Sequence, residues 1–323
     1  MGEIDRFALP FDQYQRYRAA AQIAGLLRQQ LGRPALDVLD VGGLYRTRWG
    51  QAILPLVHFL PQDRIIAADL VIEPLPHYVV ARGQALPFAR SFDLVVTCDT
   101  LEHVPPAARP GFVDELLRVT RHLLVLIAPF GNESTRLAER LLAEYMAAKG
   151  IRHEQLQEHA EHGLPDAGAV RDHVTRLGLA TLDLPDGYLH HWLAMMILKH
   201  TPGYSLDFHL DLDRYYNHHF SPHDRREPAY RRVFVVAQPG SEAILPTIAQ
   251  QWGNSDPAPE RPDLAPELLR YLNREELHPR LAALEVENAD LRRQIVGYER
   301  GRFIRLMRWL HRQRSRSSEG TSP

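Results

Sequence analysis

Short apolar runs alternate with helical patterns through the first half of the chain. The runs lie at 36–41, 65–68, 78–81, 94–97 and 123–128. Stretches with helical spacing of apolar residues stand between or before them, at 14–31 and 111–119. Near-continuous apolar strands separated by helices indicate a parallel sheet that is covered on both faces. Right-handed crossovers then predict a doubly wound α/β domain.

The pattern continues into the second half of the chain. Helices are predicted at 133–149 and 166–177, and strands at 180–184 and 232–237. An insertion rich in His, Tyr and Trp, about residues 186–230, separates those two strands and is expected to be helical. We therefore assign residues 1–238 to one domain.

A heptad pattern follows a stretch rich in Pro, Gly, Asn and Asp. That stretch, 239–265, predicts a linker, and 266–300 is predicted to be helical. Positions four and three apart form a seam over 277–298, made by Leu277, Leu281, Leu284, Asn288, Leu291, Ile295 and Tyr298. The polar Asn288 falls at an a position, which favours a parallel homodimer. The alternative is a helix whose apolar stripe docks on its own domain.

Charge is distributed unevenly along a chain that is nearly neutral as a whole. Lys and Arg number 38 against 40 Asp and Glu, a net charge of −2. Residues 292–316 hold nine Arg and one acid, a net charge of +8 that leaves −10 for the rest. The predicted basic amphipathic helix and disordered tail at 301–323, with Arg and apolar residues interleaved over 300–316, favour contact with an anionic membrane or a partner. An acidic body argues against nucleic-acid binding.

Composition places the chain among ordinary globular proteins. It has 323 residues, of which 45% are hydrophobic and 24% are charged. The single cysteine, Cys98, excludes an intramolecular disulfide and favours a reducing compartment. Since the first residues lack the pattern of a secretory signal and no apolar run reaches about 18 residues, we expect a cytoplasmic location, with a peripheral position at the inner membrane surface as an option.

Candidate chemistry begins where the first strand ends in a glycine turn. Asp40 is followed by Val41, Gly42 and Gly43, and glycine lets a backbone turn tightly and approach a ligand. Ligands of open α/β sheets lie at the carboxyl ends of strands. Asp69, at the end of the second strand, is placed to accept both hydroxyls of a ribose. The glycine pair alone is weak support, and a dinucleotide would need G-x-G-x-x-G, which this loop lacks.

Further motifs strengthen the case. The segment Leu86–Phe88 precedes Phe92-Asp93, and the fourth strand leads into Leu101-Glu102-His103. With the glycine turn and Asp69, this order resembles class I S-adenosylmethionine-dependent methyltransferases, in particular the bacterial methyltransferase type 11 group. The resemblance covers about 36–130 and, more loosely, the chain up to 237. It implies a Rossmann-like seven-stranded sheet with an antiparallel final strand, and S-adenosylmethionine as cofactor.

The resemblance also implies which residues contact the cofactor. They are Asp40, Gly42, Gly43, Asp69, Leu70, Gln84, Ala85, Leu86, Cys98, Asp99 and Thr100. The chain departs from the family where Leu44 and Arg46 replace glycines and where Gln84 replaces an acid. The first two changes are expected to reshape or weaken the pocket for the methionine moiety, while an amide at Gln84 can still donate and accept hydrogen bonds.

Histidines are the candidate groups on the acceptor side. A hydroxyl acceptor calls for a general base, for which His103, His190 and His191 are candidates, His103 by its place in the family pattern. We predict that His190, His191 and Trp192 contact the acceptor. His159 and His162 share a helical face as metal ligands would, but we interpret the segment as a solvated polar helix that ends at Gly163. We assign no metal ligands.

The predicted activity is methyl transfer from S-adenosylmethionine to a small-molecule or glycan acceptor. A loose similarity to methyltransferases of bacterial surface-polysaccharide synthesis suggests that pathway. The alternative is a catalytically weak or inactive scaffold with the methyltransferase fold, acting through its C-terminal coiled coil.

Overall fold

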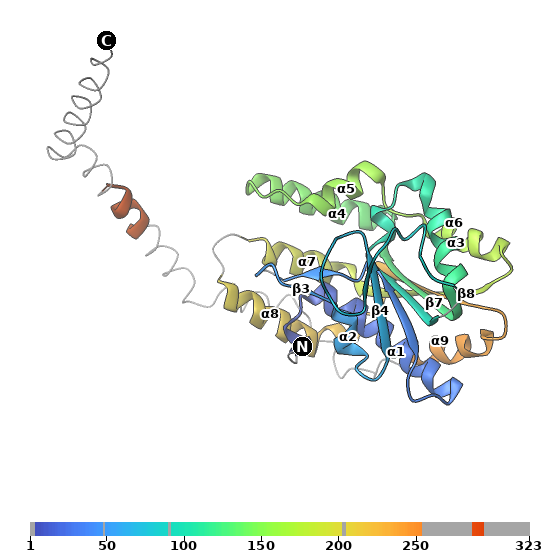
Figure 1. Ribbon diagram of the computed structural model, residues 1–323. Coiled ribbons are helices and arrows are strands. Elements are labelled where there is room, and N and C mark those ends of the chain that lie inside the picture. Colours follow the sequence, from blue (N-terminus) through green and yellow to red (C-terminus); the bar gives the residue numbers. More distant parts are fainter. Residues whose placement is uncertain (1–3, 48, 90–91, 202–204, 254–285, 294–323) are drawn as a thin grey trace, which may run out of the picture. The chain divides into compact units, whose positions relative to one another are not determined.

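A computed structural model describes residues 4–47, 49–89, 92–201, 205–253 and 286–293 (Figure 1). The chain divides into two compact units, Met1–Pro262 and Asp263–Pro323. The first unit contains the sheet and its helices, and the second is treated by itself below.

A seven-stranded sheet forms the centre of the first unit, in the order β5-β4-β1-β6-β7-β9-β8. Its strands are β1 (Asp37–Val41), β4 (Arg64–Asp69), β5 (Tyr78–Val80), β6 (Phe92–Cys98), β7 (Thr120–Pro129), β8 (Ala180–Tyr188) and β9 (Ala229–Ala237). The strands β5, β4, β1, β6 and β7 pair in parallel, whereas β9 pairs antiparallel with both β7 and β8. The predicted doubly wound sheet and its antiparallel final strand are confirmed.

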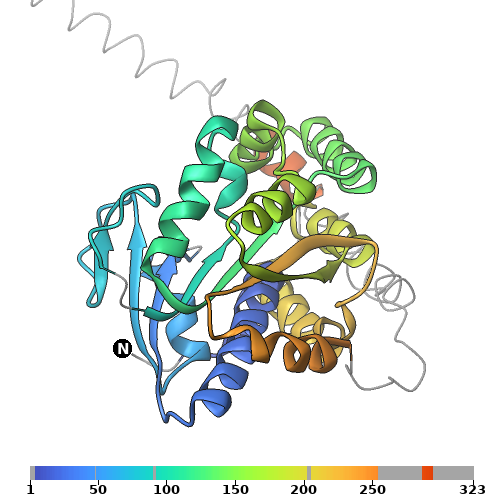
Figure 2. The same ribbon diagram turned by 90° about the vertical axis from the view of Figure 1, so that its right-hand side faces the viewer.

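Alternation along each strand builds two cores, one on each face of the sheet. Val38 of β1 belongs to one core and its neighbour Leu39 to the other, because successive side chains point to opposite faces. The helices α1 (Phe11–Leu31), α2 (Pro55–Phe59) and α9 (Leu245–Gly253) cover the first face. The helices α3 (Arg109–Val119) and α6 (Ala167–Arg176) cover the second. Figures 1 and 2 show the sheet between these layers.

Further helices follow the last central strands and the strand β8. They are α4 (Glu133–Ala148), α5 (Glu154–His162), α7 (Leu189–Lys199) and α8 (Leu206–His219), and in Figure 1 they lie beyond one end of the sheet. Capping side chains begin three of them, α4, α5 and α8; Asn132, for example, accepts from the backbone N–H of Thr135 at 2.8 Å. Short 3-10 turns connect the larger elements: η1 (Arg6–Ala8), η2 (Leu101–His103), η3 (Pro106–Ala108), η4 (Ser221–His223) and η5 (Glu242–Ile244).

Two features differ from the sequence-based expectation. A small hairpin, β2 (Tyr45–Arg46) with β3 (Ala52–Ile53), follows the glycine turn and was not predicted. The linker expected at 239–265 is wrong over its first part, because η5 and α9 continue the domain to Gly253. Ile248 and Trp252 of α9 are buried in the core beside α1. The apolar pattern of α9 covers few residues and is surrounded by Pro, Gly and polar residues, so the sequence did not predict the helix.

The second unit is described only at 286–293, which is helical and exposed. Asn288 and Leu291 of the predicted heptad seam fall there, and the side chain of Leu291 is exposed. The rest of the seam at 277–298 and the basic segment at 300–316 lie outside the described residues. Among the described helices, none is long and apolar enough to cross a membrane.

Candidate functional site

A cavity of about 510 Å³ opens at the carboxyl ends of β1 and β6 and beside the first residues of β9. Its walls come from α1, the glycine turn, η2, α5 and α7. Its lining includes Arg16, Gly42, Leu44, Arg46, Cys98, Asp99, Glu102, His103, His159, Trp192, Tyr230 and Arg231. This is the edge of the sheet at which the sequence predicts the site.

The glycine turn is packed so closely that it admits no side chain at two positions. Gly42 has a φ of +79°, and a Cβ there would lie 2.2 Å from the hydroxyl of Thr100. A Cβ on Gly43 would lie 2.1 Å from a carboxylate oxygen of Asp40. Both contacts are far below van der Waals distance, so the turn requires glycine at both positions. The predicted residues Asp40, Gly42, Gly43 and Thr100 are thereby brought together.

Asp40 is buried beneath this turn in an unusual state. The side chain is fully buried, and neither carboxylate oxygen has a hydrogen-bond partner in the described structure. Burial, with a smaller contribution from the nearby Asp69, raises the pKa of Asp40 to about 7, although Arg16 opposes the shift. Asp40 does not line the cavity itself. A buried carboxylate without a partner can be stabilised by a cation bound above the turn.

Asp69 lies at the end of β4 and holds the neighbouring loops through the backbone. One of its carboxylate oxygens accepts from the N–H of Leu70 at 2.6 Å, and the other accepts from the N–H of Leu44 at 3.3 Å. The first oxygen also accepts from the N–H of Val71 at 3.4 Å, so the oxygen that accepts from Leu44 is the one that keeps a second lone pair for another donor. The position at which the family has a second glycine thus contributes its backbone N–H to Asp69.

Arg46 changes the loop more strongly than Leu44 does. It lies in β2, and its guanidinium forms an ion pair with Glu73 of the loop after β4. The chain after the glycine turn therefore enters a hairpin, and the next helix, α2, begins only at Pro55.

Asp99 ends the fourth central strand with a positive φ of +47°. Arg231 binds it through two parallel contacts, Nε to Oδ1 at 2.8 Å and Nη2 to Oδ2 at 2.6 Å, and Arg16 forms a further ion pair. Although burial opposes ionisation, these two guanidinium groups hold the pKa of Asp99 well below its usual range. Asp99 is an ionised anchor that fixes α1 and β9 against the cavity.

Cys98 lines the cavity, whereas the residues that were predicted to border the adenine do not. Burial and the nearby Asp40 raise the pKa of the Cys98 thiol, which therefore stays protonated. Gln84 and Ala85 are exposed, whereas Leu86 is buried and donates its N–H to Glu115 at 2.7 Å. None of the three lines the cavity, and neither do Asp69 and the exposed Leu70. These five predicted cofactor contacts therefore lie outside the cavity.

His103 also lines the cavity. Its Nδ1 is 2.6 Å from a carboxylate oxygen of Glu158. Burial, aided by the nearby His159, lowers the pKa of His103. Trp192 also lines the cavity and stacks on Tyr230, with ring centroids 3.6 Å apart. A neutral imidazole next to an aromatic wall suits an acceptor that must lose a proton.

His190 and His191 do not reach the cavity, which corrects the prediction that both contact the acceptor. His190 is exposed and lies 2.9 Å from the hydroxyl of Tyr188. His191 is buried among aromatic rings, with its Nδ1 2.7 Å from Asp224. Consecutive residues of a helix point about 100° apart, so Trp192 faces the cavity while its two neighbours do not.

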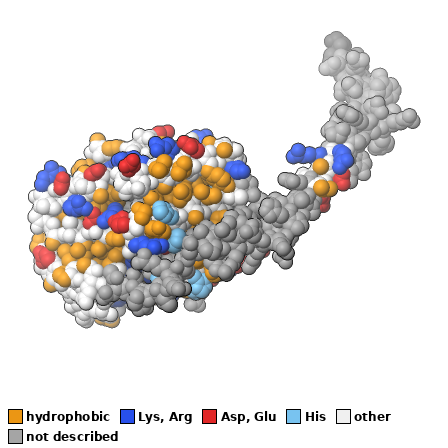
Figure 3. Space-filling model, turned by 180° about the vertical axis from the view of Figure 1, so that it is seen from behind, with side chains coloured by type: hydrophobic (Ala, Val, Ile, Leu, Met, Phe, Trp, Pro, Cys, Tyr) orange, Lys and Arg blue, Asp and Glu red, His pale blue; other side chains and the backbone are white. Residues whose placement is uncertain are grey.

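Several cavity residues were missed as site residues by the sequence analysis. Arg16 comes from α1, Tyr230 and Arg231 from β9, and Glu102 from η2. The sequence analysis noted His159 as a potential metal ligand, but paired it with His162 on the same helix. The structure instead places His159 beside His103, with ring centroids 5.2 Å apart. On the face of the molecule seen in Figure 3, several histidine side chains lie beside a broad hydrophobic area.

Comparison with known families agrees with this architecture. Residues 60–126 match the family model described as a methyltransferase domain. The matched stretch contains Asp69, the strand β6 and the turn η2, which carry the motifs noted above. The match covers the middle of the first unit and leaves the glycine turn at 42–43 outside it. No curated protein sequence matches the chain.

Solved structures resemble the chain at low sequence identity. Magnesium protoporphyrin IX methyltransferase from Synechocystis PCC 6803 is 10% identical, with 70% of this chain and 85% of that one covered and a TM-score of 0.41. The 1,6-didemethyltoxoflavin-N1-methyltransferase from Burkholderia thailandensis is 14% identical, with coverage of 68% and 78% and a TM-score of 0.37. A plantazolicin methyltransferase is 8% identical, with coverage of 71% and 86% and a TM-score of 0.42.

Proposed function

We propose that the chain transfers a methyl group from S-adenosylmethionine to a small-molecule acceptor in the cavity described above. The observation that carries the proposal is the buried Asp40 carboxylate beneath the tightly packed turn Gly42–Gly43. Two carboxylate oxygens without a partner fit a cationic ligand, and the cofactor carries a sulfonium and an ammonium group. Such a ligand would approach the turn from the cavity, which Gly42 lines.

The remaining cofactor contacts follow the strand ends. The Oδ2 of Asp69 keeps a lone pair for a ribose hydroxyl, and the exposed Leu70 supplies an apolar surface for the adenine. Gln84, Ala85 and Leu86 border that surface in the proposal. Cys98, Asp99 and Thr100 close the site at the end of β6, with Asp99 held rigid by its two arginines.

Methyl transfer is an in-line displacement that requires the acceptor atom to face the methyl group. The cofactor supplies an activated methyl group, and the chain positions the acceptor and handles its proton. His103 is placed to take that proton because it lines the cavity and its Nδ1 is held by Glu158, which leaves Nε2 as the free nitrogen. The stacked pair Trp192–Tyr230 offers an aromatic face, which suits a sugar ring, so a glycan precursor of a surface polysaccharide is our proposed acceptor class.

The scaffold alternative is favoured by the ion pair between Arg46 and Glu73, which narrows the approach to the glycine turn. Isothermal titration calorimetry with S-adenosylmethionine separates the two functions. The proposal predicts binding near micromolar concentration for the wild type and a loss of at least tenfold for Asp69→Ala. The control Asp37→Ala, at the opposite end of β1, is expected to bind as the wild type does. Absence of binding in the wild type would establish the scaffold function.

A further inference from the structure

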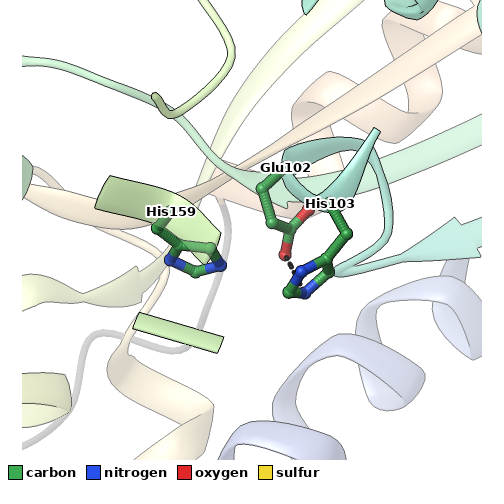
Figure 4. A group of neighbouring side chains, drawn as sticks. All are labelled: Glu102, His103 and His159. Carbon is green, nitrogen blue, oxygen red and sulfur yellow. Dashed lines mark ion pairs between the residues drawn. The ribbon is translucent and has the colours of Figure 1, made fainter. Parts of the chain in front are cut away.

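Three potential metal ligands meet on the acceptor side of the cavity. Glu102 and His103 come from η2, and His159 comes from α5 (Figure 4). One ligand atom from each residue can be chosen so that all three lie within 4.8 Å of one another. Glu102 and His159 are buried, and His103 is half-buried.

Two of these side chains carry buried atoms that nothing in the described structure satisfies. The Nε2 of His159 and the Oε2 of Glu102 have no hydrogen-bond partner. The Nε2 of His103 lies 4.0 Å from the other oxygen of Glu102. Buried polar atoms are normally paired, so two unpaired atoms in one small cluster point to a ligand that binds them together.

The opposite nitrogen of each imidazole is held by a carboxylate. The Nδ1 of His103 lies 2.6 Å from Glu158, and the Nδ1 of His159 lies 2.8 Å from Glu139. A carboxylate accepts a proton donated by Nδ1, which leaves the lone pair on Nε2. This carboxylate–histidine arrangement fixes the tautomer and orientation that a metal-binding histidine needs.

The supporting carboxylates are themselves positioned. Glu139 lies on α4 and also accepts from the hydroxyl of Tyr230 at 2.7 Å, so it joins α4, α5 and β9. Glu158 precedes His159 on α5. Arg16 and Arg231, which also line the cavity, are both paired with Asp99.

We propose that Glu102, His103 and His159 bind a divalent transition-metal ion, with Zn²⁺ as the best fit. Two imidazoles and one carboxylate with an open position are the ligand set of catalytic zinc sites. Bonds of about 2.0–2.1 Å to a tetrahedral ion require donor atoms about 3.3 Å apart. The donor atoms lie within 4.8 Å of one another and would have to draw closer on binding the ion. The sequence analysis assigned no metal ligands, because the spacing along the chain pairs His159 with the wrong histidine.

The site also narrows the acceptor class, and this part rests on the proposed function. The open position faces the cavity, where it would take an oxygen of the acceptor. A bound cation lowers the pKa of a coordinated hydroxyl, whose proton leaves to water in the cavity. The oxygen then forms a bond to the methyl carbon while the carbon–sulfur bond breaks and sulfur keeps the electron pair. We infer a hydroxyl-bearing acceptor that is methylated on oxygen, with the ion replacing His103 as the activating group.

The test is metal binding by the full-length chain after treatment with a chelator. We expect one Zn²⁺ per chain by calorimetry, and a visible Co²⁺ spectrum typical of a nitrogen- and oxygen-ligated ion. His159→Gln should lose at least 100-fold in affinity, and Glu158→Gln should lose about 10–100-fold. His162→Ala, on the same helix but outside the cluster, should bind as the wild type does.

Circular dichroism of each variant shows whether it is folded, and the Co²⁺ spectrum of the wild type stands independently of the variants. No binding by the wild type, or equal affinity in His159→Gln and His162→Ala, would overturn the site. Titration of the metal-free chain with S-adenosylmethionine separates this result from the proposed function. Zn²⁺ binding without cofactor binding supports the metal site and rejects methyl transfer, whereas cofactor binding without Zn²⁺ binding does the reverse.

Discussion

The carboxyl group of Asp40 should make the stability of the protein depend on pH in a direction opposite to that of a paired carboxylate. Its pKa of about 7 in the folded chain compares with an ordinary value of 3.8. When the pKa of a carboxyl is higher in the folded than in the unfolded chain, ionisation costs folding free energy. The cost is absent below the unfolded pKa, and the stability that depends on the protonated form is lost as the pH rises through the folded pKa. The penalty is therefore complete above about pH 7.

The size of the penalty follows from the two pKa values. At about 1.4 kcal/mol for each pKa unit, full ionisation of Asp40 costs about 4 kcal/mol. Roughly 2.5 kcal/mol of this cost develops between pH 5 and pH 8, and the rest develops below pH 5. Asp40→Asn removes the charge while it keeps the shape of the side chain. We expect the variant to gain roughly 2.5 kcal/mol over the wild type as the pH is raised from 5 to 8.

Urea unfolding of the full-length chain without cofactor, followed by tryptophan fluorescence at both pH values, measures this gain. Asp37→Asn is the matched control, because Asp37 lies at the other end of the same strand and forms a surface ion pair with Arg64. Its stability change should stay within about 1 kcal/mol at both pH values. If Asp40→Asn differs from the wild type by the same amount at pH 5 and pH 8, the reasoning about the buried carboxylate is refuted. Under the proposed function, the same variant should bind S-adenosylmethionine at least tenfold more weakly.

Three further changes test other parts of the structure. Gly43→Ala places a methyl group against Asp40 and should cost about 1–3 kcal/mol in urea unfolding, whereas Gly111→Ala, which meets open space, should be neutral or slightly stabilising. Arg231→Met leaves the buried Asp99 with Arg16 alone and should cost about 3–5 kcal/mol, against less than about 1 kcal/mol for the surface variant Arg64→Met; equal costs would contradict the assigned burial. Trp252→Ala should cost about 3–5 kcal/mol by thermal or urea unfolding, and a change below about 0.5 kcal/mol would show that α9 does not belong to the core.

The central strands could be predicted because buried strands of a parallel sheet consist of uninterrupted apolar runs. The run at 123–128, for example, lies inside β7, whose residues are buried from Leu123 to Pro129. The hairpin β2–β3 could not be predicted, since two residues on each side carry too little periodicity to distinguish strand from loop. The helix α9 was hidden for a related reason, because the side chains that it buries stand among turn-forming residues.

The candidate site divides in the same way. Gly42, Asp40 and Asp99 were predictable because each directly follows or ends a strand, and the carboxyl ends of parallel strands share one edge. Glu102 and His159 could not be paired from the sequence, since 57 positions and four other elements separate them. Only the docking of α5 against η2 brings them together. His191 and Trp192 show the converse limit, because adjacent residues of α7 face different surroundings.

The central claim is that the turn Gly42–Gly43 and Asp69 hold S-adenosylmethionine next to the cavity. A crystal structure of the full-length chain with S-adenosylhomocysteine tests it most directly. We expect the amino-acid part of the ligand to lie over Gly42–Gly43, its ribose hydroxyls to bind Asp69, and its sulfur to point toward His103. A ligand bound elsewhere, or crystals that take up none at saturating concentration, would contradict it.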